Sequence, residues 1–284
     1  MNYLYYIDHK MTPMTLSCIS HVKRTLDGTG KRPPPPPQAV FFTFAIDRSG
    51  SMRSYGSSVA EQTFQLIGEQ QDSAMKTGIP TYMTLTTFDD ISEEKMSQVK
   101  LGSPISPDSE PTMTNLRKWL TPRNCTRLID TAIECVDDLV ASRKNYIKKM
   151  STEIRELIND DSVKMIFALF TDGSDNASDH INKDLNKKIS DYQNQNGVAI
   201  FMAANQDAIN TGGDFGFSPD RSLSVGNCSR TASSALRHTT QLITSAGSGE
   251  RDVSYTMAMR EESQEATYLD NNNPVNVCGV PTRL

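Results

Sequence analysis

The sequence has no long apolar run, which limits the classes of protein it can belong to. The N-terminal run Tyr3–Ile7 stops at Asp8, too short for the apolar core of a signal peptide. The longest apolar stretches fall well short of the ~20 residues that a membrane-spanning helix needs. The sequence therefore predicts a chain without a membrane span.

Cysteine is scarce and follows no pairing pattern. The chain has five cysteines, an odd number, and none of them form a Cys-x-x-Cys spacing. They are Cys18, Cys125, Cys135, Cys228 and Cys278. Neither a disulfide framework nor a zinc site is indicated, and free thiols in a reducing compartment fit better. The sequence thus predicts an intracellular chain, in the cytoplasm or assembled in a particle, rather than a classically secreted one.

Charge of one sign is not in large excess. The 29 Lys and Arg residues against 34 Asp and Glu residues give a net charge of −5. The pairs Lys148–Lys149 and Lys187–Lys188 are short, and we interpret them as solvated helix faces. A basic stripe is the usual footprint of a nucleic-acid-binding protein, so the sequence disfavours direct nucleic-acid binding.

From residue 40 onward, strand patterns alternate with helical patterns, which predicts a parallel α/β sheet. The expected strands are 40–47, 82–88, 96–101, 163–170, 198–204 and 222–225. The expected helices are 57–77, 112–120, 128–140 with an extension towards Leu157, 181–195 and 231–245. Residues 38–247 form the predicted domain. Residues 1–37 and 248–284 are predicted to be extended segments.

The N-terminal segment ends in the proline run Pro33–Pro37. Five prolines favour polyproline II, at ~3.1 Å per residue, and so predict a stiff spacer before the domain. The alternative is a ligand for an aromatic groove on a partner.

Oxygen-bearing side chains gather at the ends of two predicted strands. Asp47, Ser49 and Ser51 follow the buried strand that begins at Val40, and Asp172 follows the strand 163–170. A further hydroxyl, that of Thr126, lies in a loop that leads into a helix. Mg²⁺ prefers near-octahedral coordination by oxygen, so these residue types suit a divalent cation.

These stretches resemble the metal-ion-dependent adhesion site of the von Willebrand factor type A (vWA) family. The matching residues are Asp47-Arg48-Ser49-Gly50-Ser51, Thr126 in its loop, and Thr171-Asp172-Gly173. The resemblance implies a doubly wound, mostly parallel six-stranded sheet of order 3-2-1-4-5-6, with helices on both faces. Ligands of such sheets bind where the strand order reverses, here between the first and fourth strands. The phrase Ala204-Asn205-Gln206-Asp207-Ala208 resembles a branch of the family found in bacteria and large DNA viruses.

The resemblance also implies roles for these residues toward Mg²⁺ or Mn²⁺. Ser49 and Ser51 bind the ion directly, and Thr126 binds it directly or through water. Asp47 and Asp172 mostly hold the coordinating waters. Neutral direct ligands leave the ion electrophilic, and in this family a Glu or Asp of a protein partner completes the coordination. The candidate rim of the partner-binding surface is Arg48, Asn124, Asp175, Asn205 and Asp207.

Some of these residues have simpler interpretations. Thr126 would serve as a helix cap, because Asn124-Cys125 departs from the Gly-Gly that is usual in the family. Asp175 and Asp207 would lie in surface turns. A further acidic cluster predicts a solvated hairpin turn, and it consists of Asp89, Asp90, Glu93 and Glu94.

The predicted function is a non-enzymatic, metal-dependent protein-interaction module. It would serve as a structural or docking subunit of a larger assembly, such as a virion or capsid, with neighbouring subunits contacting both tails. The alternative is a Mg²⁺-dependent phosphohydrolase of the haloacid-dehalogenase type, suggested by Asp47 after a buried strand. Those enzymes need a second Asp two residues later, where this chain has Ser49. No Gly-x-Ser-x-Gly elbow surrounds the serines either.

Overall fold

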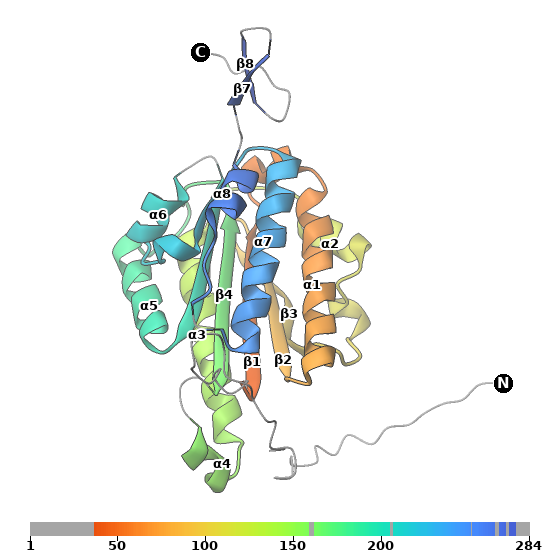
Figure 1. Cartoon of the computed structure of the whole chain (residues 1–284), viewed down its shortest axis with the longest axis vertical. Helices are drawn as coiled ribbons and strands as arrows, with labels where there is room; N and C mark the ends of the chain where they lie inside the picture. The colour runs from red at the N-terminus through yellow and green to blue at the C-terminus, as the bar shows by residue number, and fades with distance from the viewer. Residues whose placement is uncertain are drawn as a thin grey trace, which may run out of the picture. The chain divides into compact units, whose positions relative to one another are not determined.

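A six-stranded sheet forms the centre of the domain (Figure 1). The computed structural model describes residues 37–158, 162–204, 207–250 and 252–264, and the backbone of 267–270 and 273–276. The strands are β1 (Ala39–Asp47), β2 (Thr81–Phe88), β3 (Ser92–Lys100), β4 (Val163–Thr171), β5 (Gly197–Ala204) and β6 (Ser222–Val225). Their order is β3-β2-β1-β4-β5-β6, and only β3 is antiparallel to its neighbour. The predicted strand order and α/β class are confirmed.

The central strands β1 and β4 are buried along their whole length because helices cover both faces of the sheet. Side chains alternate between the faces. On β1, Phe42, Phe44 and Ile46 pack toward one face, and Phe41 and Ala45 pack toward the other. Each such burial contributes roughly 1.5–3 kcal/mol for a large apolar side chain.

Different helices cover the two faces, as Figure 1 shows. One face packs against α1 (Ser58–Thr77), α2 (Met113–Trp119) and α7 (Ser229–Ser248). The other packs against α3 (Leu128–Lys148), α5 (Asn182–Asn194) and the start of α6 (Ala208–Asp214). None of the helices that the structure describes is long and apolar enough to cross a membrane.

Two element boundaries differ from those predicted. The helix from residue 128 ends at Lys148, and a separate helix, α4 (Thr152–Leu157), follows it. The Ser151 side chain accepts a hydrogen bond from the Ile154 N–H, and such an N-cap starts a new helix. Strand β3 begins at Ser92 rather than near Met96, so Glu93 and Glu94 lie in a strand and not in a turn.

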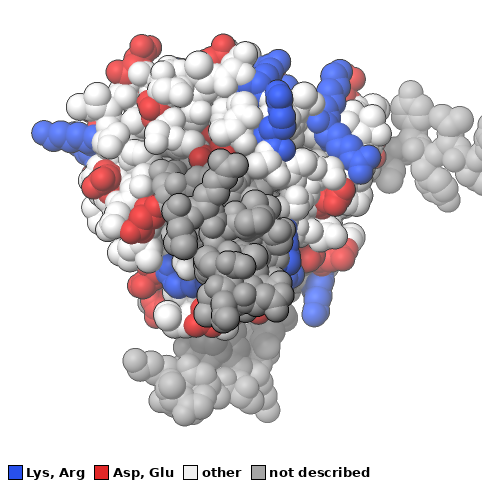
Figure 2. Space-filling view, turned by 90° about the horizontal axis from the view of Figure 1, so that it is seen from above, with Lys and Arg blue, Asp and Glu red and all other residues white. Residues whose placement is uncertain are grey.

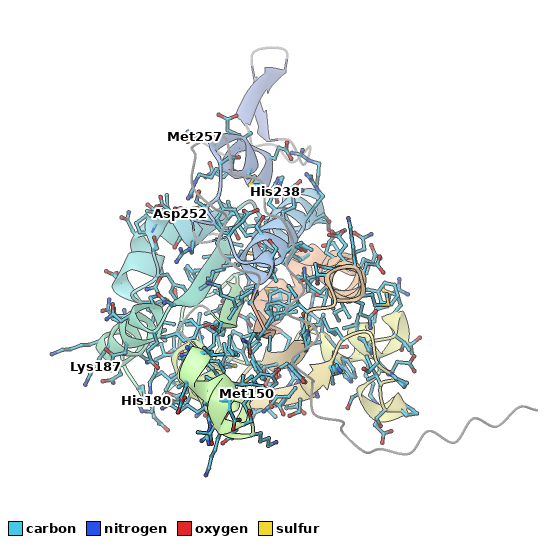
Figure 3. The ribbon with its side chains drawn as sticks, turned by 60° about the horizontal axis from the view of Figure 1, so that its bottom comes forward. Met150, His180, Lys187, His238, Asp252 and Met257 are labelled. Atoms are coloured by element: carbon cyan, nitrogen blue, oxygen red, sulfur yellow. The ribbon has the colours of Figure 1, made fainter. Side chains whose placement is uncertain are left out.

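Residues 252–264 belong to the predicted extended tail, but they pack against the domain. They include α8 (Met257–Ser263), which lies beside α7 and β6. In Figure 3, His238 is labelled on α7 and Met257 at the start of α8. The His238 ring nitrogen Nε2 lies 3.0 Å from Glu262 Oε2, and Arg260 donates to the Ser222 carbonyl. The predicted N-terminal segment, including the proline run up to Pro36, lies outside the described residues.

The cysteines differ in state. Cys125 and Cys135 are free thiols, the first exposed and the second buried. Cys228, beside the N-terminus of α7, is disulfide-bonded. The prediction of free thiols is therefore wrong for Cys228.

Acidic and basic side chains are interspersed on the face of the molecule seen in Figure 2. The charge arrangement on that face matches the near balance of the composition.

Candidate metal centre

The parallel pairing of β1 with β4 brings Asp47 and Asp172 to one edge of the sheet. Ile46 pairs with Phe170, so Asp47 ends β1 beside Thr171 at the end of β4. The Thr171 hydroxyl donates to Asp47 Oδ2 at 2.6 Å. Two parts of the predicted site that are far apart in sequence are thus hydrogen-bonded at the switch point of the sheet.

The turn after β1 places its two serines over this edge. The Ser49 N–H donates to Asp47 Oδ1 at 2.6 Å, a bond from the backbone to the side chain two residues earlier, which fixes the turn. Ser49 Oγ lies 3.1 Å from Ser51 Oγ. Ser51 in turn donates to Asp172 Oδ1 at 2.6 Å. Asp47, Ser49, Ser51 and Asp172 therefore belong to one hydrogen-bonded group.

Thr126 joins this group from the loop before α3. Its N–H donates to Asn176 Oδ1 at 2.8 Å, and its carbonyl accepts from the Asn176 and Ala177 N–H groups. These bonds hold Thr126 against the loop after β4. A methyl group added to Gly173 would lie 3.4 Å from Thr126 Oγ1 and 3.6 Å from Ser51 Oγ. The two hydroxyls therefore border the same small space.

The N-cap position of α3 is Arg127, so Thr126 does not cap this helix. The N–H groups of Leu128 and Ile129 are bound by Asp175 Oδ1, at 2.8 and 3.2 Å. Asp175 therefore stabilises the start of α3 from across the loop and also fixes the Thr126 loop. The Asp175 carboxylate therefore binds backbone N–H groups at the start of α3, and the residue does not simply lie in a surface turn.

Burial disfavours the charged forms of the two carboxylates at this edge of the sheet, Asp47 and Asp172. It raises the pKa of Asp47 to about 6, against hydrogen bonds from Thr171 and Ser49, and the charge of Asp172 adds to the rise. Burial also raises the pKa of Asp172, against its bond from Ser51. Within the described part of the chain, Asp172 Oδ2 is buried without a hydrogen-bond partner. A cation placed beside these two buried carboxylates, one of which has an unpaired oxygen, would stabilise their charged forms.

The donor set is made of hard oxygen atoms. Within the ranges that the structure describes, no three His, Cys, Asp or Glu side chains cluster as they do in a carboxylate or thiolate metal site. Here three hydroxyls, those of Ser49, Ser51 and Thr126, accompany two carboxylates. Such a set fits Mg²⁺ or Mn²⁺ and does not fit metals that prefer thiolate.

The prediction that Arg48 lies on the partner-binding rim is wrong. Its side chain is only 4% exposed and points away from the metal centre. Arg48 Nε donates to Asp89 Oδ2 at 3.1 Å, and its guanidinium also pairs with Glu93. Arg48 is thus bound to Asp89, whereas its neighbours Asp47 and Ser49 bind within the hydrogen-bonded group of the candidate metal centre. Asp89, predicted in a solvated turn, is fully buried.

The other rim residues have separate positions. Asn124 is exposed, with a φ of 56°, and its side chain donates to Asp90 Oδ1 at 2.9 Å. Asp207 is exposed and caps α6 through the Ile209 and Asn210 N–H groups. Asn205 lies outside the described residues.

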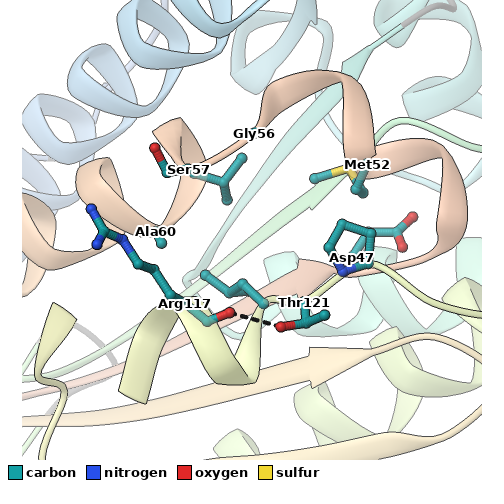
Figure 4. A pocket seen from close by; sticks show the side chains of 10 residues that line it. Asp47, Met52, Gly56, Ser57, Ala60, Arg117 and Thr121 are labelled. Atoms are coloured by element: carbon teal, nitrogen blue, oxygen red, sulfur yellow. Dashed lines mark hydrogen bonds between the residues drawn. The ribbon is translucent and has the colours of Figure 1, made fainter. Parts of the chain in front are cut away.

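A small cavity of about 220 Å³ adjoins the metal centre between α1 and α2 (Figure 4). Asp47 and Met52 border it on one side and Arg117 and Ala60 on the other, as the figure shows. Leu120 adds to its apolar wall, together with Pro122. No sequence pattern indicates this cavity, because its walls come from separate segments.

No protein-family model matches the sequence, and no curated protein matches it. Several solved structures are similar to the chain. Proximal thread matrix protein 1 from the mussel byssus is 14% identical, with a TM-score of 0.43 over 74% of this chain and 48% of that protein. A von Willebrand factor type A protein from Catenulispora acidiphila is 12% identical, with a TM-score of 0.48 over 73% of this chain and 43% of that one.

The pilus adhesin SpaC from Lactobacillus rhamnosus GG, in its open conformation, is 13% identical. Its TM-score is 0.49, over 75% of this chain and 31% of SpaC. The chain thus spans less than half the length of each of these three proteins. At these identities and TM-scores, the assignment of the fold depends on the strand order of this chain itself.

Proposed function

We propose that this chain is a metal-dependent protein-interaction module of the vWA type. The observation that carries the proposal is the convergence of five oxygen-bearing side chains, with Asp172 Oδ2 buried and unpaired among the described residues. Ser49, Ser51 and Thr126 would bind Mg²⁺ or Mn²⁺, and Asp47 and Asp172 would hold the surrounding waters. A bound cation would supply a Lewis-acidic position for an external carboxylate. The partner would be a protein that offers a Glu or Asp side chain.

The residues of the chain support binding better than catalysis. Asp47 is only 1% exposed, and both of its carboxylate oxygens accept hydrogen bonds, from the Thr171 hydroxyl and the Ser49 N–H, so little of it is open to a substrate. A haloacid-dehalogenase enzyme would need a general acid where Ser49 stands. The proposal is therefore a non-enzymatic module. One structure of the mussel byssus protein has zinc in its metal-ion-dependent adhesion site (MIDAS) motif. That zinc is a property of the mussel protein.

The narrower part of the proposal is a docking role in a larger assembly, such as a virus particle. Its support is the likeness of residues 204–208 to the bacterial and viral branch of the family. Intracellular location and contacts between the tails and neighbouring subunits belong to the same proposal.

Calorimetric titration of the whole chain with Mg²⁺ and with Mn²⁺ tests the metal site. We expect binding by the natural chain and none by Asp47→Ala, with the circular dichroism spectrum retained because the site lies at the edge of the sheet. The matched control is Asp207→Asn, which alters an exposed carboxylate in the loop after β5. Unchanged affinity in Asp47→Ala would contradict the assignment.

The partner is tested by affinity capture with and without EDTA. We expect the same proteins to be lost on adding EDTA and on using Asp47→Ala as bait. If the same proteins are captured in the presence of EDTA and with Asp47→Ala as bait, the interaction does not depend on the metal and the proposal is contradicted.

A further inference from the structure

The structure contains a second polar cluster, beneath the metal centre, that the proposed function does not use. Its centre is Asp89, which follows the last residue of β2 and has no exposed surface. The Asp89 carboxylate accepts hydrogen bonds from Arg48 Nε, Arg123 Nε and the Ile91 N–H. Two guanidinium groups and a backbone donor thus surround one buried carboxylate. Burial alone would raise the pKa of Asp89, but the bonds from these donors lower it, so it is held as an anion.

The first branch of this cluster runs to the turn that carries Asp47, Ser49 and Ser51. Arg48 lies between two residues of the metal centre, and its side chain points to Asp89. Its N–H donates to the Phe88 carbonyl at 2.8 Å, and its Nη1 donates to the Trp119 carbonyl at 3.3 Å. These bonds fix the backbone and side chain of Arg48, while the side chains of Ser49 and Ser51 remain on the side of the candidate metal centre.

The second branch runs to the loop that carries Thr126. Arg123, three residues before Thr126, pairs with both Asp89 and Glu93. Its N–H donates to the Arg48 carbonyl at 2.8 Å. Arg127, one residue after Thr126, donates its N–H to the Asp89 carbonyl at 2.6 Å. Asp89 therefore contacts the Thr126 loop on both sides of Thr126.

We infer that Asp89 is a positioning residue that sets the distance between the serine turn and the Thr126 loop. This inference rests on the proposed metal centre. Asp89 binds the residues next to Asp47, Ser49 and Thr126, and so acts on these side chains through their neighbours. Without the Asp89 charge, Arg48 and Arg123 would keep only Glu93, whose side chain is 35% exposed, as a counter-charge. Removing one partner of a buried pair is strongly destabilising, so the two arginines would be held less firmly and the loops could separate. Groups that orient metal ligands from outside typically change metal affinity about 10- to 100-fold when they are removed.

The test compares Asp89→Asn with the natural chain in two measurements. The first is the affinity for Mn²⁺ by calorimetry, where we expect the dissociation constant to rise by about 10- to 100-fold. The second is amide hydrogen exchange of the metal-free protein, where we expect faster exchange at residues 48–51 and 123–127. The control is Ile189→Val, a core change on α5 that lowers stability without touching either loop. It should leave both measurements at the two loops unchanged.

Arg123→Gln keeps the inference testable if Asp89→Asn does not fold. The Arg123 side chain is 46% exposed, so its loss is compatible with folding. We expect a smaller rise in the dissociation constant, with faster exchange confined to residues 123–127.

A failure of the proposed function can be distinguished from a failure of the inference about Asp89. If the natural chain binds neither Mn²⁺ nor Mg²⁺, the proposed function is wrong, and hydrogen exchange alone decides the role of Asp89. If the natural chain binds Mn²⁺ and Asp89→Asn binds it equally well, with equal exchange at both loops, the inference is overturned. A loss of affinity in Ile189→Val as large as that in Asp89→Asn would also overturn it, because the effect would then be one of general stability.

Discussion

At the scale of single residues, the candidate metal centre is built from small side chains that leave space between them. Ser51 Oγ and Thr126 Oγ1 border the space above Gly173, and a larger side chain there would compete for it. The hydroxyls pack closely around Asp47 and Asp172 because serine, threonine and aspartate all have short side chains. Shape and charge at this edge of the sheet thus favour a small cation.

Substitutions at Gly173 test whether a cation occupies the space between Ser51 Oγ and Thr126 Oγ1. Alanine would place its methyl group at 3.4 Å from Thr126 Oγ1, an ordinary contact, so Gly173→Ala should fold and bind Mn²⁺. The branches of valine would extend between the two hydroxyls, so Gly173→Val should lower Mn²⁺ affinity at least about tenfold, which is about 1.4 kcal/mol. Calorimetry on both variants checks this. Equal affinity in the two variants would mean that the cation does not occupy this space.

The proximity of Asp47 and Asp172 could be predicted from the sequence, but the groups that hold the candidate metal centre in place could not. Asp47 and Asp172 were predictable because strand ends meet at one edge of a parallel sheet. The burial of Asp89 was not, since it depends on Arg123, 34 residues later in the chain. Charged residues near a turn are usually solvated, and only the tertiary structure shows that these form a buried ion pair.

At the scale of secondary structure elements, the start of α3 is stabilised by two carboxylates. Asp175 binds its first N–H groups, and Asp130, in its first turn, reaches across to the loop before α5. Asp130 accepts from the Asp179 and His180 N–H groups at 2.9 and 3.0 Å. The two carboxylates join α3 to the segment after β4 and so fix the Thr126 loop between them.

Asp130 gives this junction a pH dependence. Burial alone would raise the pKa of Asp130, but the N–H donors, the His180 ring and Arg127 lower it from 3.8 to about 2. Since the folded pKa is the lower one, the stabilisation is fully present above pH ~4 and is lost as the pH falls toward ~2. At about 1.36 kcal/mol per pKa unit, it amounts to about 2 kcal/mol.

The variant Asp130→Asn should therefore be less stable than the natural chain by about 2 kcal/mol at about pH 7, with the difference shrinking below pH ~4. Urea unfolding at several pH values measures this. The control Asp137→Asn lies on the same helix but is 59% exposed, and it should change stability by less than about 0.5 kcal/mol. A difference for Asp130→Asn that is constant with pH would contradict this role for its charge.

Helices α6 and α8 were not predicted from the sequence, although α2, which is equally short, was. Helix α6 contains Gly212 and Gly213, and glycine in a helix interior costs roughly 1 kcal/mol relative to alanine. It forms because Asp207 caps it and its first residue, Ala208, is fully buried against the sheet. Neither feature is visible in a local pattern. The long helices α1, α3 and α7 run for 20 or 21 residues, and their apolar faces could be predicted from periodicity.

At the scale of the whole molecule, different parts of the chain close the two faces of the sheet. Helices α3 and α5 close one face, and α1, α2 and α7 close the other. The second face also takes Val253 and Tyr255, which come from the segment predicted to be an extended tail. Both side chains are buried. The sequence pattern could not show this, because residues 248–264 have no apolar period and their packing depends on a few single side chains.

Tyr255 anchors this C-terminal segment. Its side chain is 5% exposed, its hydroxyl lies 2.6 Å from Thr239 Oγ1 on α7, and its N–H donates to the Asp220 carbonyl at 2.9 Å. Removing a large aromatic side chain from a core typically costs about 3–5 kcal/mol. Tyr255→Ala should therefore destabilise the whole domain by about that amount, measured by urea unfolding of the full chain. The control is Met257→Ala, at an exposed position two residues later, which should change stability by less than about 0.5 kcal/mol. Equal stability of the two variants would show that residues 252–264 do not belong to the domain, and the boundary predicted at residue 247 would then hold.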